Sequence, residues 1–350
     1  MNAPLLTNFD QSKPRSRTKN PEDMSLPWKR LIRFIATDGR TLRGEPILPA
    51  STTDLGFITE SDKLQARMIE GDDLYDTTGK TRVTDEIVSV KTILGPLAQA
   101  DVPILRCVGL NYAKHVINIS TVSIVKEAGR TPPPFPFIFF KPNTTIHDHG
   151  VPVVIPQIAQ DSQADYEGEL CLVIGRDAKN VSTENALSYV AAYTVGNDIS
   201  ARKLQRDPSL AGRVPQWGFS KGFDTFAPLG PCLIAASEIS DPSKLLLKTI
   251  VDGEIRQEEY VADLLFDCAY LVSYLSQGTT LQKGSVIMTG TPGGEFHLFF
   301  VMFFALELVE LTCLLGVGAS LLPPKYLVPG TQMDVVIDGI GTLRNGVVFD

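Results

Sequence analysis

The feature that most constrains the fold of this chain is a series of short apolar runs bounded by proline or glycine. The runs lie at residues 31–36, 104–109, 137–140, 170–175, 190–196 and 335–341. Apolar segments of this length between turn residues are typical of buried strands. Helical spacing is scarcer and predicts helices at 85–98, 182–190 and 262–276. Because strands and helices do not alternate regularly, the pattern argues against a doubly wound sheet and predicts a β-rich α+β fold.

The length of the chain indicates more than one domain. At about 150 residues per domain, 350 residues suggest two. Residues 1–27 are polar and lack the apolar core of a secretory signal, so we expect a disordered leader there. Pro96 and Pro103 bracket an expected boundary. We therefore expect a small N-terminal β-rich domain over residues 28–98 and a larger domain over residues 99–350.

The composition excludes several classes of protein. Asp and Glu number 40 against 32 Lys and Arg, a formal charge of −8, which argues against a nucleic-acid partner. The five cysteines are scattered and form no Cys-x-x-Cys pair, so neither a disulfide framework nor a thiolate zinc site is indicated. We expect a cytoplasmic protein with reduced thiols. A mitochondrial location stays open, although Asp10, Glu22 and Asp23 disfavour a transit peptide.

Three acidic residues at the ends of apolar strands suggest a metal site. Glu167 and Glu169 are two residues apart where an apolar strand begins, so both carboxylates project from one face of an extended chain. Asp198 follows the next apolar strand. Like charges this close repel unless a cation lies between them, and hard oxygen ligands favour Mg²⁺ or Mn²⁺ over zinc. The alternative is that the two glutamates form an exposed strand edge.

Other segments carry side chains suited to catalysis. His115 follows a strand and a glycine turn, where it could serve as a proton carrier or simply cap the turn. Lys221 lies among aromatic residues and glycines, where burial would make its ammonium a stabiliser of negative charge. The constrained turn at 289–294 is suited to offering hydroxyl and N–H groups to an anion. For His147 and His149 we favour a turn, because no third zinc ligand accompanies them.

Six segments together resemble one enzyme family. They are GLNYAKH, FPFIFFKP, DYEGEL, GNDISARKLQ, GFSKGFDTFAP and TGTPGG, in that order. The chain from about residue 30 to the C-terminus resembles the fumarylacetoacetate hydrolase family, in its acylpyruvase and oxaloacetate decarboxylase/tautomerase branch. This resemblance implies a mixed β-sandwich roll with a small N-terminal domain, assembled as a homodimer.

The resemblance also implies roles for individual residues. The Mg²⁺ (or Mn²⁺) ligands would be Glu167, Glu169 and Asp198, and the catalytic residues would be His115, Glu127 and Lys221. The substrate-binding residues would be Arg202, Gln205 and Thr291. The implied activity is metal-dependent chemistry on C–C bonds of small keto or diketo acids, with no nucleic-acid or membrane partner. Acylpyruvate hydrolysis, oxaloacetate decarboxylation and keto–enol tautomerisation stay open, because all three use the same electrophilic centre.

Two segments depart from the family pattern. Residues 117–125 (INISTVSIV) separate His115 from Glu127, which the pattern would place three residues apart. Residues 295–316 interrupt the sequence after the TGTPGG turn with an apolar run that is too short to span a bilayer. We interpret both as insertions, from altered splicing, an error in the gene model or a lineage-specific loop. A second hypothesis is therefore a catalytically impaired homologue that binds metal, ligand or a partner subunit without turnover.

Overall fold

The computed structural model describes residues 25–50, 53–113, 133–294, 317 and 324–350. His115, Glu127, both expected insertions and nearly all of the expected leader lie outside the described residues. In the described part, no helix is long and apolar enough to cross a membrane.

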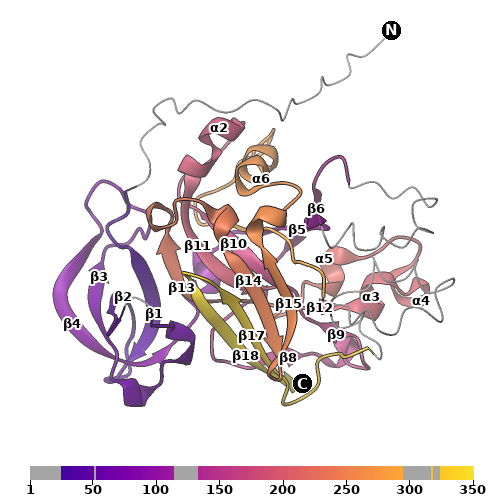
Figure 1. Cartoon of the computed structure of the whole chain (residues 1–350), viewed down its shortest axis with the longest axis horizontal. Helices are drawn as coiled ribbons and strands as arrows, with labels where there is room; N and C mark the ends of the chain where they lie inside the picture. Colours follow the sequence, from indigo (N-terminus) through magenta and orange to yellow (C-terminus); the bar gives the residue numbers. More distant parts are fainter. Residues whose placement is uncertain (1–24, 51–52, 114–132, 295–316, 318–323) are drawn as a thin grey trace, which may run out of the picture.

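Strands dominate the described chain, which confirms the predicted β-rich α+β fold (Figure 1). The largest sheet runs in the order β2-β3-β4-β1-β13-β11-β10-β16-β5-β6, and β7 pairs with β13. These strands are β1 (Arg30–Ala36), β2 (Thr41–Ile47), β3 (Gln65–Glu70), β4 (Arg82–Ile93), β5 (Leu105–Gly109), β6 (Phe137–Lys141), β7 (Ile146–His147), β10 (Gly168–Ile174), β11 (Val190–Asn197), β13 (Ala227–Ala235) and β16 (Val286–Met288).

Two smaller sheets complete the strand structure. A five-stranded sheet has the order β15-β14-β17-β18-β8, and a two-stranded sheet pairs β12 with β9. Their strands are β8 (Val153–Ile155), β9 (Ala164–Asp165), β12 (Ser200–Ala201), β14 (Leu246–Val251), β15 (Glu254–Tyr260), β17 (Gln332–Ile337) and β18 (Gly341–Phe349). The helices are short: α2 (Thr183–Ala186), α3 (Arg202–Arg206), α4 (Pro208–Ala211), α5 (Trp217–Ser220) and α6 (Cys268–Leu275).

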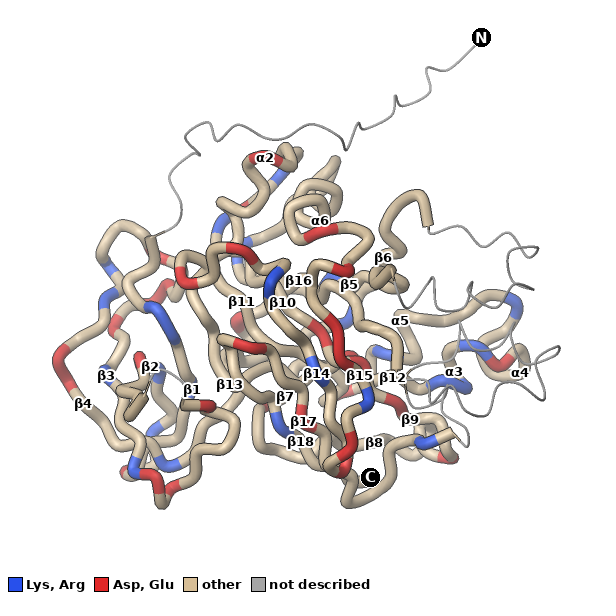
Figure 2. The backbone as a smooth tube through the Cα atoms, in the orientation of Figure 1, with Lys and Arg blue, Asp and Glu red and all other residues tan. Residues whose placement is uncertain are grey.

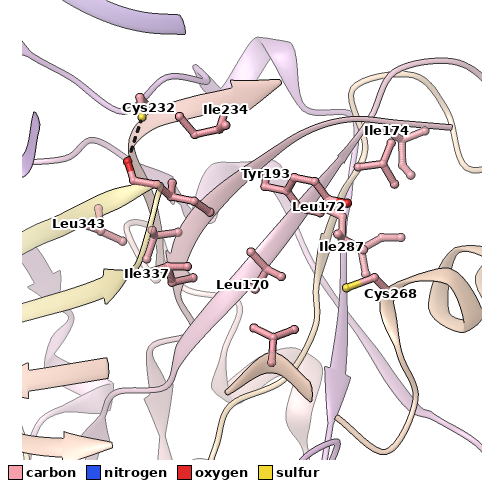
Figure 3. Packing of buried hydrophobic residues seen from close by; sticks show 14 of the residues in the cluster. Leu170, Leu172, Ile174, Tyr193, Cys232, Ile234, Cys268, Ile287, Ile337 and Leu343 are labelled. Carbon is pink, nitrogen blue, oxygen red and sulfur yellow. Dashed lines mark hydrogen bonds between the residues drawn. The ribbon is translucent and has the colours of Figure 1, made fainter. Parts of the chain in front are cut away.

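The centre of the core is β10, whose seven residues are all buried. Its even-numbered side chains, Leu170, Leu172 and Ile174, belong to one hydrophobic cluster, and Figure 3 shows them beside Ile287 of β16 and Tyr193 of β11. Cys171 and Val173 point the other way into a second cluster. Both faces of β10 are therefore covered, and Glu169 shares the face of Cys171 because side chains alternate along a strand.

The predicted helix at 85–98 is wrong, because this segment forms most of β4. Its buried residues Val90 and Ile93 are three apart, which imitates helical spacing. The pairing with β1 shifts register here, since Ile35 pairs with Thr92 and Ala36 pairs with Val90. A bulge of this kind adds one residue and so returns both side chains to the core face. The β-branched content of the segment also favours a strand.

The other two predicted helices are shorter than expected. The segment 182–190 forms α2 followed by a 3₁₀ turn at Leu187–Tyr189. The segment 262–276 begins in a 3₁₀ turn at Val261–Asp263 and becomes α-helical only at α6, where the Asp267 carboxylate accepts from the Tyr270 N–H at 2.7 Å. Before that cap, the N–H groups of Leu265 and Phe266 donate to Asn111 instead of to a preceding helical turn. A tertiary contact therefore overrides the local helical pattern.

The turn expected at His147 and His149 forms at His149, whereas His147 ends the short strand β7. The His147 Nε2 lies 2.9 Å from the Pro152 carbonyl oxygen, and the His149 Nδ1 accepts from the Arg344 N–H at 3.1 Å. Burial, followed by the nearby Arg344 charge, lowers the pKa of His149 to about 4, against the opposing effect of neighbouring aspartates.

We predict that His149 makes the fold sensitive to mild acid. Its pKa in the folded chain is below the unfolded value of about 6.5, so the unfolded state takes up the proton first as pH falls. Linkage then lowers the free energy of unfolding by about 2 kcal/mol between pH 7.5 and 5. Urea unfolding of the parent and of His149→Gln at both pH values tests this. The variant should lose less stability on acidification, and parallel pH profiles would contradict the assignment.

Candidate metal and substrate site

Three buried carboxylates meet where β10 and β11 lie side by side. Glu167 directly precedes β10, Glu169 is its second residue and Asp198 directly follows β11. The register pairs Gly168 with Asn197, and the Asp198 N–H donates to the Glu167 carbonyl at 2.8 Å. One ligand atom from each side chain lies within 4.8 Å of the others. Antiparallel pairing thus brings together acids that are about 30 residues apart in the sequence.

A glycine between the two glutamates allows the sheets to approach. A Cβ atom at Gly168 would lie 2.2 Å from the Thr249 Oγ1 of β14 and 2.9 Å from the Val335 Cγ1 of β17. Real side chains do not tolerate such distances, so any larger residue would force the two sheets apart. The glycine in the DYEGEL segment therefore sets how close the carboxylates lie to the five-stranded sheet.

Buried cations compensate two of the three carboxylates. The fully buried Lys221 Nζ donates to the Glu167 Oε2 at 2.7 Å and to the Asp198 Oδ2 at 2.6 Å. The Arg202 guanidinium donates to the other oxygen of Glu167 and to the Asp165 Oδ2. Burial opposes ionisation of Glu167, but Arg202 and Lys221 outweigh it and hold the pKa of Glu167 well below its usual range.

Glu169 is the exception. Its Oε2 accepts from the Gly290 N–H at 2.7 Å, but no cation of the described chain forms an ion pair with it. Burial, followed by the charges of Asp198 and Glu167, raises the pKa of Glu169 well above its usual value. Glu169 thus lacks a compensating positive charge, although it is 1% exposed.

The donor set fits a divalent metal ion. All three side chains offer carboxylate oxygens, the hard ligands that Mg²⁺ and Mn²⁺ prefer. A cation among them would supply the charge that Glu169 lacks and would relieve the repulsion between the three acids. Among the described residues, this is the one group of three or more His, Cys, Asp or Glu side chains close enough to hold a metal.

The expected substrate-binding residues border this group. Arg202 and Gln205 lie on α3, where the Gln205 Oε1 accepts from the Arg202 Nη1 at 3.1 Å. The Gln205 Nε2 is buried and has no hydrogen-bond partner in the part of the chain that the structure describes. Thr291 lies in the turn after β16, and its hydroxyl donates to the Gly168 carbonyl at 2.8 Å. The structure therefore brings Arg202 and Gln205 to Glu167, and it connects Thr291 to the backbone between the two glutamates.

The sequence analysis missed Lys141, a second buried lysine at this site. It ends β6, is 0% exposed, and donates from Nζ to the Asp198 Oδ1 at 2.5 Å and to the Phe226 carbonyl at 2.6 Å. The signal was a lysine at the end of the apolar FPFIFFKP segment, since a lysine in a buried strand needs a charged partner. Two lysines thus hold Asp198, one at each oxygen.

The sequence analysis also missed Gln257 on β15. Its Oε1 accepts from the Gly168 N–H at 3.1 Å, and its Nε2 donates to the Thr291 Oγ1 and the Pro292 carbonyl, both at 2.6 Å. This fully buried amide fastens the TGTPGG turn to the glutamate strand. No motif marks Gln257, because β15 (EIRQEEY) shows no regular apolar alternation.

A β-rich fold with a buried group of carboxylates at its strand ends could hold a metal ion, and sequence comparison assigns the family. The family model for the fumarylacetoacetate hydrolase C-terminal domain matches residues 105–348, so the chain belongs to the fumarylacetoacetate hydrolase family.

Relatives cover nearly the whole chain. Caffeoylpyruvate hydrolase of Neonothopanus nambi is 36% identical over 331 residues, which are 93% of this chain and 94% of that protein. The mitochondrial oxaloacetate tautomerase fahd2 of Xenopus laevis is 33% identical and covers 98% and 97%. Among solved structures, 2-hydroxyhepta-2,4-diene-1,7-dioate isomerase from Mycobacterium marinum is 28% identical with a TM-score of 0.63, over 93% of this chain and 99% of that one.

We predict that removing the Lys141 ammonium destabilises the fold. Lys141→Met leaves an Asp198 oxygen and the Phe226 carbonyl without their donor, so the free energy of unfolding should fall by about 3 kcal/mol. Urea unfolding measures the loss. Lys203→Met is the matched control, because Lys203 is an exposed lysine of α3. Equal stability of the two variants would show that the buried ion pair contributes nothing.

Proposed function

We propose that this chain is a divalent-metal-dependent enzyme that acts on C–C bonds of small 2-keto acids. The observation that carries the proposal is Glu169, a buried carboxylate without a compensating cation beside two other acids. The relatives support the substrate class, since their names specify an acylpyruvate hydrolase and an oxaloacetate tautomerase. The proposed cofactor is Mg²⁺ or Mn²⁺, held by Glu167, Glu169 and Asp198.

When bound, the metal would act as a Lewis acid toward a chelating keto acid and stabilise enolate charge. The Lys221 ammonium has three N–H bonds and donates two of them to Glu167 and Asp198. Its third N–H is therefore available to a developing oxyanion, and its Nζ lies 5.1 Å from the Phe139 ring centre and 5.2 Å from that of Trp217. In this dry setting a hydrogen bond to an oxyanion is stronger than in water.

Residues of α3 and of the turn after β16 would orient the substrate. The Gln205 Nε2, which has no partner among the described residues, would donate to a carboxylate oxygen of the substrate. The Thr291 hydroxyl is held by Gln257 and Gly168, and it would contact the same carboxylate. Arg202 donates to Asp165, Glu167 and Gln205, so its contribution would be to hold Glu167 and Gln205 in place.

The general base is proposed from the sequence alone. His115, aided by Glu127, would remove a proton from water for attack on the distal carbonyl of a 1,3-diketo acid. Decarboxylation of oxaloacetate or its tautomerisation would need no water at the carbonyl. The homodimer, the cytoplasmic location and the domain boundary at residues 98/99 likewise stay predictions.

We predict that Glu169→Gln abolishes metal binding without weakening the metal-free fold. The amide keeps the shape of the side chain but removes one of three mutually repelling charges, so metal-free stability should be equal or higher. In the parent, Mg²⁺ with oxalate at 100 times the dissociation constant should add about 2.7 kcal/mol of stability. The variant should show no such gain in thermal unfolding and no turnover of oxaloacetate or acetylpyruvate.

The control for this experiment is Glu86→Gln, the same change at an exposed position of β4. It should keep both the metal response and the activity of the parent. Metal-dependent turnover that survives Glu169→Gln would falsify the ligand assignment.

We also predict that deleting residues 117–125 raises activity at least about 100-fold, since it restores His-Val-Lys-Glu and a correctly placed general base contributes a factor of that order. The measurement is kcat/KM on acetylpyruvate, with the Mg²⁺ response of thermal unfolding as a check that the metal site is unchanged. If the deletion leaves the rate as it was, the segment does not impair catalysis and the hypothesis of a damaged base loses its support.

A further inference from the structure

Helix α3 carries an arginine that the described chain leaves without a partner. Arg206 lies four residues after Arg202 and is half-buried. No hydrogen bond or ion pair to Arg206 forms within the part of the chain that the structure describes, and its Nε is buried without a partner. The Nε2 of the neighbouring Gln205 is likewise buried without a partner there. Two neighbouring residues thus present buried N–H donors that have no acceptor among the described residues.

Arg206 lies on the side of α3 that faces the carboxylate site. Residues i and i+4 of a helix are neighbours on one face, and Arg202 is bound to Asp165 and Glu167. The charges that act on Arg206 are those of Arg202, Asp165 and Glu167, together with the Tyr326 phenol. Burial first, and then the charge of Arg202, lower the pKa of Arg206 to about 10, so the guanidinium stays charged at neutral pH.

The two arginines of the helix therefore differ in what they can bind. Arg202 donates to two carboxylates and an amide, whereas Arg206 makes no hydrogen bond within the described residues and its Nε is buried there without a partner. A buried donor without an acceptor is costly, and a planar guanidinium fits a carboxylate best, because the two can form paired hydrogen bonds. Figure 2 shows basic residues on α3, and its sequence RKLQR contains no acidic residue. The helix thus favours an anionic group beside the site.

We propose that Arg206 binds a second carboxylate at the end of the substrate remote from the 2-keto acid. This inference rests on the proposed function and narrows its substrate class to dicarboxylic 2-keto acids. Oxaloacetate carries such a second carboxylate. Acetylpyruvate, which has the same 2-keto acid group but ends in a neutral acetyl group, does not. Arg206 is in this sense a specificity residue rather than part of the reacting centre.

The test compares kcat/KM for these two substrates, with Mg²⁺, in the parent, Arg206→Gln, Arg206→Lys and Lys203→Gln. Loss of a charged hydrogen bond should lower kcat/KM of Arg206→Gln for oxaloacetate roughly 10- to 100-fold, mostly through KM. The value for acetylpyruvate should change less than about twofold. Arg206→Lys should recover part of the loss, because it keeps the charge. Lys203→Gln removes one positive charge from the exposed face of the same helix and should change neither value.

Each other outcome has a defined meaning. Equal losses on both substrates, or no loss on either, overturn the role of Arg206, and urea unfolding of each variant identifies losses due to misfolding. Should the parent turn over neither substrate, the proposed function fails instead. Dissociation constants for the same two compounds, measured by calorimetry on the Mg²⁺-loaded chain, then test the role of Arg206. Arg206→Gln should weaken binding of oxaloacetate but not of acetylpyruvate.

Discussion

Repulsion between buried carboxylates at the ends of β10 and β11 is the constraint around which this structure is organised. Folding brings Glu167, Glu169 and Asp198 within 4.8 Å and removes them from water. Burying uncompensated charge is expensive, so cations must come from elsewhere in the chain. Lys141 arrives from β6 and Lys221 from the end of α5, and both are completely buried. Elements distant in sequence are therefore tied to one electrostatic centre.

The part of this site that could be predicted from sequence is the part with a local signature. Glu167 and Glu169 stand two residues apart on a strand, and alternation alone places them on one face. Lys141 and Gln257 could not be predicted in this way, because their roles depend on which strands become neighbours. The wrong helix at 85–98 has a related cause. The bulge opposite Ile35 and Ala36 moved Val90 and Ile93 onto the core face, and only the pairing with β1 reveals it.

The three carboxylates of the site are not equally compensated by positive charge, and this difference indicates the chemistry of the site. Glu167 and Asp198 are held by cations of the chain, which keeps their geometry fixed whether or not a metal is present. Glu169 is held by one backbone N–H, so its charge is compensated only when something binds. On α3, the Gln205 Nε2 and the Arg206 Nε are buried donors without acceptors among the described residues, which is the opposite imbalance. A cation at the acids and an anion at the helix would together complete the site.

Strand β10 supplies Glu169 and also separates the two hydrophobic clusters. The position of the Glu169 carboxylate and the packing of the core therefore depend on the same strand. Leu170 and Cys171 follow Glu169 directly, and each packs into a different cluster. A change of volume at either side of the strand displaces the same peptide units that position the carboxylate. Substitutions of apolar residues that touch neither Glu169 nor any bound ion should therefore still change the affinity of the proposed metal site.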